Sequence, residues 1–311
     1  MLTRFIDKFI QRVAFVIMLC MMMAACSDSD DDAVGTEDVS VAFTLTVADA
    51  TATRAENDGW DDYSPAQDGI LNENLVNTDD IIIAIYDDKG NKVDNVEDLR
   101  VTAVSDPSIT GATVYAITGV WKNAKPNVDK AKRIMVIANS NATTWGDPSA
   151  LTYDLNPGTR KYIPMWGVVK IPATLTLGKQ NQLHNIQMLR AMAKVSVSLR
   201  TDMTKYGYAI GSMTVNNYNT RGYCVPKTFN EVDNTSEVRF ANSLNVLDSH
   251  ADKIALPTTA PLYLPEYDNS GTNPTTITVN LNRNGTFEGS YTLEFRNYDS
   301  DGKPTGSTYP I

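Results

Sequence analysis

The chain has 311 residues with 27 basic and 37 acidic side chains, and its formal net charge is −10. A surface this negative repels nucleic acid phosphates, which disfavours nucleic acid as a partner. The length is sufficient for two domains of ordinary size.

The first 25 residues are typical of a lipoprotein signal peptide. Basic residues precede an apolar run from Val13 to Ala25, which is too short to remain as a spanning helix. The run closes with Met23-Ala24-Ala25-Cys26, which looks like the lipobox of bacterial lipoproteins. We therefore expect cleavage between Ala25 and Cys26, and a diacylglycerol and palmitate anchor on Cys26. The alternative is an ordinary secretory signal that happens to end near a cysteine.

An acidic segment follows the lipidated cysteine and reads as a solvated tether over residues 26–38. It resembles the export signal that Bacteroidetes lipoproteins carry beside the lipidated cysteine, which implies the outer face of the outer membrane; a periplasmic-facing position is the alternative. Without residues 1–25, which carry three basic groups and one acid, 24 basic and 36 acidic residues remain, a net charge of −12. The signal residues are Ser27, Asp28, Asp30, Asp31 and Asp32.

The cysteines exclude an internal disulfide. Cys20 is removed with the signal peptide and Cys26 is lipidated, so Cys224 is left alone. Stability must then come from burial of a hydrophobic core.

Beyond the tether, the sequence alternates as β-strands do. In residues 39–47 apolar side chains occupy every second position, which indicates a strand with one buried face. These apolar positions are Val39, Val41, Phe43, Leu45 and Val47. Further runs of this kind cover residues 81–86, 113–120, 133–138, 194–199, 210–215, 276–281 and 290–295.

Turn residues separate these runs, and helical patterning is scarce. Asn284-Gly285 joins two of the runs and predicts a tight hairpin, while short helical pieces are expected near residues 148–151 and 243–251. Strands without intervening helices predict an all-β fold of antiparallel sandwiches. We expect an N-terminal β-sandwich over residues 39–203 and a C-terminal β-sandwich over residues 204–311.

Several segments, in order, resemble the fimbrillin superfamily of Bacteroidales, the subunits of the type V pilus. The similarity covers nearly the whole chain, although each segment alone is weakly specific. The matching segments are the lipidated leader, the strand 39–47, the loop Ala52-Thr53-Arg54-Ala55, the strand 81–86 with Asp87-Asp88-Lys89-Gly90, and residues 133–139, 163–167, 189–195 and 261–267.

The resemblance implies two transthyretin-like domains and assembly with other fimbrial subunits by strand exchange, with a role in adhesion to a host or bacterial surface. An Arg-directed protease would cut after the first strand, and Arg54 stands at the matching position; a solvated loop arginine is the alternative. Another chain's strand would then replace Val39–Val47. Related subunits also continue beyond a segment like Thr308–Ile311. We therefore expect either a C-terminally incomplete chain or a terminal subunit, and we favour the former.

Sequence signals for catalysis and cofactors were not found. The chain has no zinc-protease, serine-nucleophile, phosphate-loop or dinucleotide motif, so we expect no cofactor, no metal and no enzyme activity. Asp87–Asn91 could offer oxygen ligands to calcium, but it fits a plain turn better. A thiol dyad of Cys224 with His184 or His250 is a weak alternative.

A second functional class remains open. Trp60 and Tyr63 lie among carboxylates, a composition shared with sugar-binding loops, although such aromatic residues more often pin a loop to its domain. The alternative to a fimbrial subunit is therefore a surface glycan-binding lipoprotein of a polysaccharide-uptake system. Trp121, Trp145 and Trp166 are assigned to cores or interfaces.

Overall fold

The predicted all-β class is confirmed by the computed structural model, whose described part consists of strands, loops and short 3-10 turns. It describes residues 36–47, 75–104, 113–141, 150–155, 162–171, 174–225, 229–231, 238–240, 246–247, 249–258, 261–299 and 303–308. No helix in these segments has the length and hydropathy to cross a bilayer.

Within the described segments the elements follow one another without a long helix. They are β1 (Val39–Val47), β2 (Ile81–Tyr86), β3 (Lys92–Asn95), β4 (Glu97–Val104), β5 (Thr113–Trp121), η3 (Val128–Lys130), β6 (Arg133–Ala138), β7 (Thr152–Asp154), β8 (Met165–Lys170), β9 (Gln180–Gln182), β10 (Ile186–Arg190), β11 (Ala193–Val195), η5 (Met203–Tyr206), β12 (Tyr208–Asn219), β13 (Arg221–Tyr223), β14 (Phe229–Glu231), β15 (Val238–Phe240), β16 (His250–Leu256), β17 (Leu262–Leu264), β18 (Thr276–Arg283), β19 (Thr286–Glu294), β20 (Asn297–Tyr298) and β21 (Pro304–Thr305).

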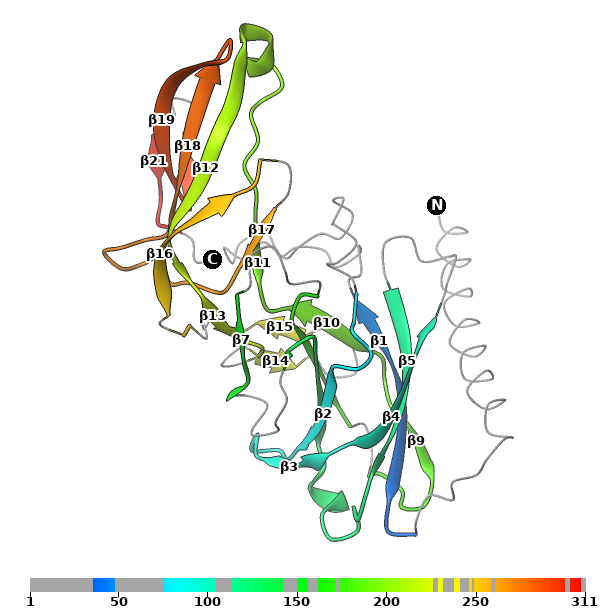
Figure 1. Cartoon of the computed structure of the whole chain (residues 1–311). Helices are drawn as coiled ribbons and strands as arrows, with labels where there is room; N and C mark the ends of the chain where they lie inside the picture. Colours follow the sequence, from blue (N-terminus) through cyan, green and yellow to red (C-terminus); the bar gives the residue numbers. More distant parts are fainter. Residues whose placement is uncertain are drawn as a thin grey trace, which may run out of the picture.

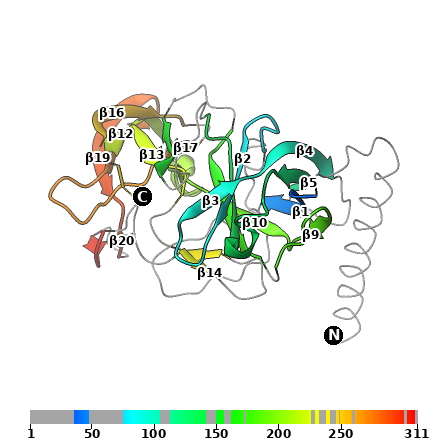
Figure 2. The same cartoon turned by 90° about the horizontal axis from the view of Figure 1, so that it is seen from below.

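The first body is one strongly bent sheet with the order β3-β2-β6-β8-β10-β1-β5-β4, and β9 also pairs with β1. Strand β10 carries the bend, because residues 186–188 pair with β1 whereas residues 189–190 pair with β8. In Figures 1 and 2, β1, β5 and β9 lie together on one side of the first body, and β2 and β3 lie on the other side. One hydrophobic core joins side chains from both sides.

Strand β1 lies within this sheet and not at its edge. The strand spans the predicted residues Val39–Val47, and its burial alternates as predicted except at Ala42, which is also fully buried. The predicted strands Ile81–Tyr86 and Arg133–Ala138 are likewise confirmed as β2 and β6. Strand β2 is buried at every position, because its apolar run has almost no polar face to turn outward.

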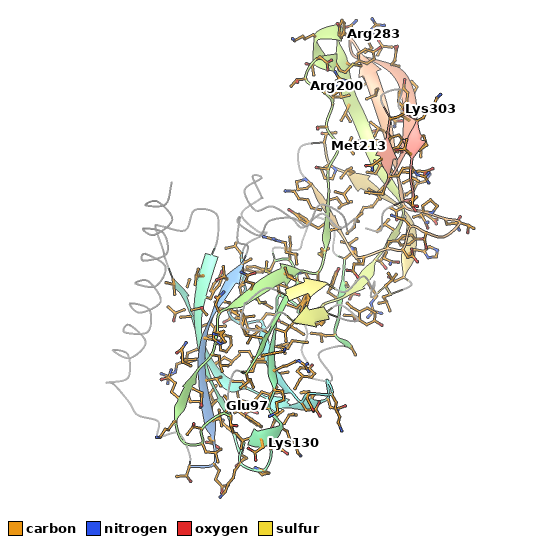
Figure 3. The ribbon with its side chains drawn as sticks, turned by 180° about the vertical axis from the view of Figure 1, so that it is seen from behind. Glu97, Lys130, Arg200, Met213, Arg283 and Lys303 are labelled. Atoms are coloured by element: carbon orange, nitrogen blue, oxygen red, sulfur yellow. The ribbon has the colours of Figure 1, made fainter. Side chains whose placement is uncertain are left out.

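The second body is built on a four-stranded antiparallel sheet, β16-β12-β18-β19. The ribbon of β11 and β17 contributes Val195, Leu262 and Leu264 to the same core as Val215 and Ile277 of this sheet. Figure 3 shows Arg283 and Arg200 at the far tip of this body, and Glu97 and Lys130 at the opposite end of the molecule.

The two cores do not divide at a single point in the sequence. Val195 belongs to the second core, whereas Cys224 and Val225 belong to the first. A ribbon of β7 and β13 also pairs a strand from each half of the chain. The boundary between residues 203 and 204 stays a prediction.

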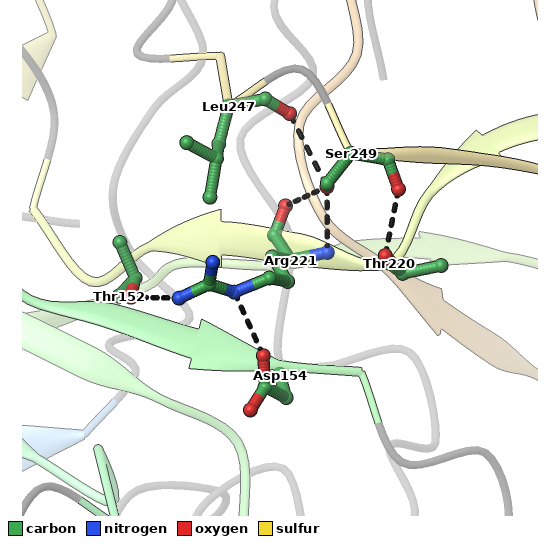
Figure 4. Close-up of polar contacts among 6 residues, drawn as sticks. All are labelled: Thr152, Asp154, Thr220, Arg221, Leu247 and Ser249. Atoms are coloured by element: carbon green, nitrogen blue, oxygen red, sulfur yellow. Dashed lines mark hydrogen bonds and ion pairs between the residues drawn. The ribbon is translucent and has the colours of Figure 1, made fainter.

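Polar contacts fasten the β7–β13 ribbon (Figure 4). The Arg221 Nε atom lies 2.9 Å from an Asp154 carboxylate oxygen, and the same guanidinium donates to the Thr152 hydroxyl at 3.0 Å. The Arg221 backbone N–H donates to the Ser249 hydroxyl at 3.0 Å, and the Thr220 hydroxyl donates to the Ser249 carbonyl at 2.6 Å. These bonds link β7, β13 and the segment entering β16.

The hairpin predicted at Asn284-Gly285 is confirmed. Arg283 pairs with Thr286, and both turn residues have positive φ, 51° and 84°. This is the backbone of a type I′ turn, which asparagine and glycine tolerate better than other residues.

Two local expectations were wrong. The run predicted as a strand over residues 194–199 pairs only as Ala193–Val195, because its partner β17 is three residues long. The helical piece expected near residues 243–251 overlaps the start of β16 at His250. There the long strand β12 supplies backbone partners, and this pairing overrides local propensity.

Candidate functional site

The position occupied by β1, called here the β1 slot, has backbone partners on both sides. Strand β5 pairs antiparallel along the whole of β1: Val39 lies opposite Trp121 at one end, and Val47 lies opposite Thr113 at the other. On the other side β1 runs parallel to β9 and β10, with Ser40–Ala42 opposite Gln180–Gln182 and Leu45–Val47 opposite Ile186–Met188. Removing β1 would therefore expose two rows of unpaired N–H and C=O groups facing each other.

The inner face of β1 contributes a large part of the first core. All five alternating apolar side chains predicted to face inward are fully buried: Val39, Val41, Phe43, Leu45 and Val47. At roughly 1.5–3 kcal/mol each, they supply about 8–15 kcal/mol of transfer free energy, comparable with the whole stability of an ordinary domain. Hence β1 cannot leave the slot at equilibrium unless another strand takes its place.

The N-terminal end of β1 is fastened by the preceding acidic residues. An Asp38 carboxylate oxygen accepts from the Asn123 N–H at 2.8 Å, and the Asp38 carbonyl accepts from the Gly178 N–H at 2.7 Å. Glu37 and Lys125 form an ion pair at 2.9 Å, but both side chains are more than half exposed. Such a pair contributes little, so the backbone bonds mainly hold this end.

The outer face of β1 is polar and meets two asparagines. The Asn181 amide nitrogen donates to the Ser40 carbonyl at 3.1 Å. Between β9 and β10, the Asn185 amide oxygen accepts hydrogen bonds from the hydroxyls of Thr44 at 2.8 Å and Thr46 at 2.9 Å. These contacts join β1 to its parallel neighbours through side chains as well as backbone.

After β1, the next described segment starts at residue 75, and a buried polar cluster holds it. The Tyr115 hydroxyl accepts from the Val76 N–H at 3.1 Å. The Asn139 amide, almost fully buried, donates to the carbonyls of Leu75 and Ile163 and accepts from the Asn77 N–H. This cluster ties the chain to β5 and β6.

Other predicted site residues lie outside the described residues. They are Ala25 and Cys26 of the signal cleavage and lipidation site, the export-signal residues Ser27, Asp28, Asp30, Asp31 and Asp32, Arg54 of the maturation loop, and the aromatic residues Trp60, Tyr63 and Trp145. Their assignments stay predictions.

The residues considered for other chemistry are placed as structural groups. Cys224 is fully buried in the first core, whereas His184 and His250 are exposed. Trp121 and Trp166 are buried, as predicted, and the Trp121 indole donates to an Asp94 carboxylate oxygen at 2.9 Å. Cys224 is therefore a packing residue of the first hydrophobic core.

The Asp87 turn is held by its own carboxylate. This carboxylate accepts from the backbone N–H groups of Lys89 and Asn91 and from the Asn91 amide, while Gly90 takes a positive φ of 81°. The Asn91 side-chain bond is the largest cause that lowers the pKa of Asp87 below its usual 3.8. Within the described segments, no three or more His, Cys, Asp or Glu side chains form a cluster that could hold a metal ion.

Sequence reasoning missed the residues that shape the slot walls. A side chain at Gly167 would place its Cβ 2.5 Å from the Gln187 carbonyl and 2.6 Å from an Ile186 methyl, so only glycine lets β8 approach β10. Gly119, opposite Val41, similarly makes room for Val96. Both glycines lie in otherwise apolar strands, which is the available sequence signal for a close backbone approach.

Comparisons with known proteins add one structural likeness. No family model and no curated protein matches the chain. Among solved structures, the chain is similar to a fimbrial assembly protein from Parabacteroides distasonis, with 14% sequence identity and a TM-score of 0.44, over 82% of this chain and 85% of that one. A TM-score at this level does not assign the chain to a family.

Proposed function

We propose that this chain is a fimbrial subunit, exported as a lipoprotein to the outer surface, whose β1 strand is exchanged for a strand of another subunit during assembly. The observation that carries the proposal is the position of β1. It is the first strand of the described residues, yet it lies between β5 and β9/β10 and fills the core. One cut behind this strand would allow it to be replaced without breaking the chain between the later strands.

The chain around the slot suits such a replacement. Residues 48–74 join β1 to Leu75 and include Arg54, the proposed cleavage position. No β1 atom takes part in the bonds by which Asn139 and Tyr115 hold residues 75–77, and Tyr115 also lies opposite Leu45 in the β1–β5 ladder. After a cut at Arg54, β1 would be a separate strand and the new N-terminal part would stay attached to the sandwich.

The proposed role is non-enzymatic, with other subunits as partners and a host or bacterial surface as the adhesion target. Cys26 would anchor the precursor to the outer membrane before assembly. The resemblance of the sequence to fimbrillins supports this assignment, and the full burial of Cys224 in the first core supports a structural role for that cysteine.

The test is limited digestion of the purified chain with an Arg-specific protease. The proposal expects one early cut at Arg54, followed by ladders on unheated gels as strands exchange between chains. The variant Arg54→Lys is the matched control, since it keeps the charge and resists the protease. Loss of the folded body after the cut, or an identical pattern in the control, would count against the assignment.

One observation supports a second candidate function, that of a surface glycan-binding lipoprotein. The tip of the second body exposes aromatic rings, with Tyr206 65% and Phe287 63% exposed, and Arg283 lies 5.4 Å from the centre of the Tyr208 ring. Sugars stack on such faces. A glycan pull-down that succeeds with the parent chain and fails with Tyr206→Ala would favour this candidate.

A further inference from the structure

The buried face of β1 only partly determines the register in which the strand pairs with its neighbours. A strand shifted by one residue would turn its apolar side chains away from the core, so that error is strongly disfavoured. A shift by two residues keeps apolar side chains inward at the overlapping positions. Another contact is needed to distinguish the native register from this slip.

Asn185 supplies a contact with the right geometry. Its amide oxygen bonds the hydroxyls of both Thr44 and Thr46, which lie two residues apart on the same face of β1. An amide oxygen has two lone pairs, so the two hydroxyls complete its accepting capacity. All three side chains are half-buried, where a lost hydrogen bond is incompletely replaced by water.

The position of Asn185 is fixed by the parallel ladder itself. The residue directly precedes Ile186, which pairs with Leu45, and it follows Leu183, whose N–H donates to the Ala42 carbonyl at 2.9 Å. Asn185 therefore faces Thr44 and Thr46 only in the native register. After a two-residue slip it would face Ala42 with Thr44, or Thr46 with Ala48, and one bond would be lost.

We propose that Asn185 selects the strand that enters the β1 slot, an inference that rests on the proposed strand exchange. The preferred strand has five alternating apolar residues and hydroxyl side chains at the two positions that correspond to Thr44 and Thr46. Asn185 is a specificity-determining residue that recognises the hydroxyl side chains on the outer face of the strand, while the core selects for apolar side chains on its inner face. An apolar face alone is thus not sufficient for a strand to be a preferred partner.

The test uses the full chain after cutting at Arg54 and synthetic peptides that span Glu37–Ala48. The parent peptide is compared with one carrying Thr44→Val and Thr46→Val, which keeps side-chain shape and removes both hydroxyls. A Ser40→Val peptide is the control, because it loses a hydroxyl of the same face about 13 Å away along the strand. Labelled peptides are bound and their dissociation from the slot is followed by fluorescence anisotropy.

The expected result is that the double valine peptide dissociates about tenfold faster than the parent, while the Ser40→Val peptide behaves as the parent does. On an Asn185→Leu chain the parent and double valine peptides should dissociate at equal rates. Equal rates on the unaltered chain would overturn the role of Asn185 and leave strand exchange standing. Failure of every peptide to enter the cut chain would refute the proposed function and this inference together.

Register can be measured separately on the unaltered Asn185 background. Ser40 lies opposite Val120 of β5, so a Ser40→Cys peptide should cross-link to a Val120→Cys chain, and an Ala42→Cys peptide should do so only after a two-residue slip. The inference expects the Ala42→Cys cross-link to increase when both threonines are replaced by valine. An unchanged ratio of the two cross-links would contradict register selection.

Discussion

Replacing Phe43 by alanine tests whether β1 is an integral part of the first core. Phe43 is fully buried at the centre of β1, and truncating a buried phenylalanine typically costs about 3–5 kcal/mol. That is about a fifth or more of the stability expected for a whole domain, about 5–15 kcal/mol. The variant Phe43→Ala should therefore unfold at a much lower denaturant concentration.

The assay is urea unfolding followed by tryptophan fluorescence, because Trp121 and Trp166 are buried in the same core as Phe43. Phe287→Ala is the matched control, since that phenylalanine is 63% exposed on β19 and its loss should change stability by less than about 0.5 kcal/mol. A change below about 1 kcal/mol for Phe43→Ala would refute the packing described for β1.

Three further predictions concern the surrounding structure. Gly167→Ala should destabilise the first body by about 1–3 kcal/mol in thermal unfolding, because its Cβ would meet a backbone carbonyl 2.5 Å away; Gly271→Ala, with nothing within 4 Å, should not. Gly285→Ala should cost about 1 kcal/mol in the same assay because of its positive φ, and an unchanged midpoint would contradict the type I′ turn. Asn91→Ala should raise the pKa of Asp87 toward 3.8, and NMR titration of the Asp87 carboxyl carbon measures this change. In the parent chain, the stabilisation from this carboxylate is present above pH 3.8 and is lost as the pH falls through the lowered pKa.

Local apolar patterns predicted the strands that pack against one core. Residues 39–47 were assigned correctly because their apolar residues alternate on the buried face, and residues 81–86 and 133–138 because their continuous apolar runs suit strands that are buried almost throughout. The Asn284-Gly285 hairpin was also readable, since few residues tolerate its backbone. Such features depend on neighbours close in the chain.

The pairing of β1 with β9 and β10 could not be predicted in the same way. Parallel partners about 140 residues apart leave no local signature, and Asn185 reads in sequence as an ordinary loop residue. The bend of β10 and the close approach at Gly167 are likewise properties of packing. For this reason the sequence predicted strand β1, whereas its neighbours β9 and β10 were found only in the structure.

Under the proposed strand exchange, the position of β1 requires that cutting and exchange be coupled. The strand has backbone partners on both edges and five buried apolar side chains, so its spontaneous loss is costly. A cut at Arg54 would remove the covalent link without removing these contacts. An incoming strand that forms the same ladder residue by residue can offset the loss as it proceeds.

The most direct measurement mixes the Arg54-cut chain with an excess of an isotope-labelled peptide spanning Glu37–Ala48 and weighs the folded complex by native mass spectrometry. The expected result is gradual replacement of the original N-terminal fragment by the heavier strand, with no uptake by uncut Arg54→Lys chains. Retention of the original fragment at all peptide concentrations would contradict an exchangeable β1. Equal uptake by the uncut chains would show that cleavage does not control the slot.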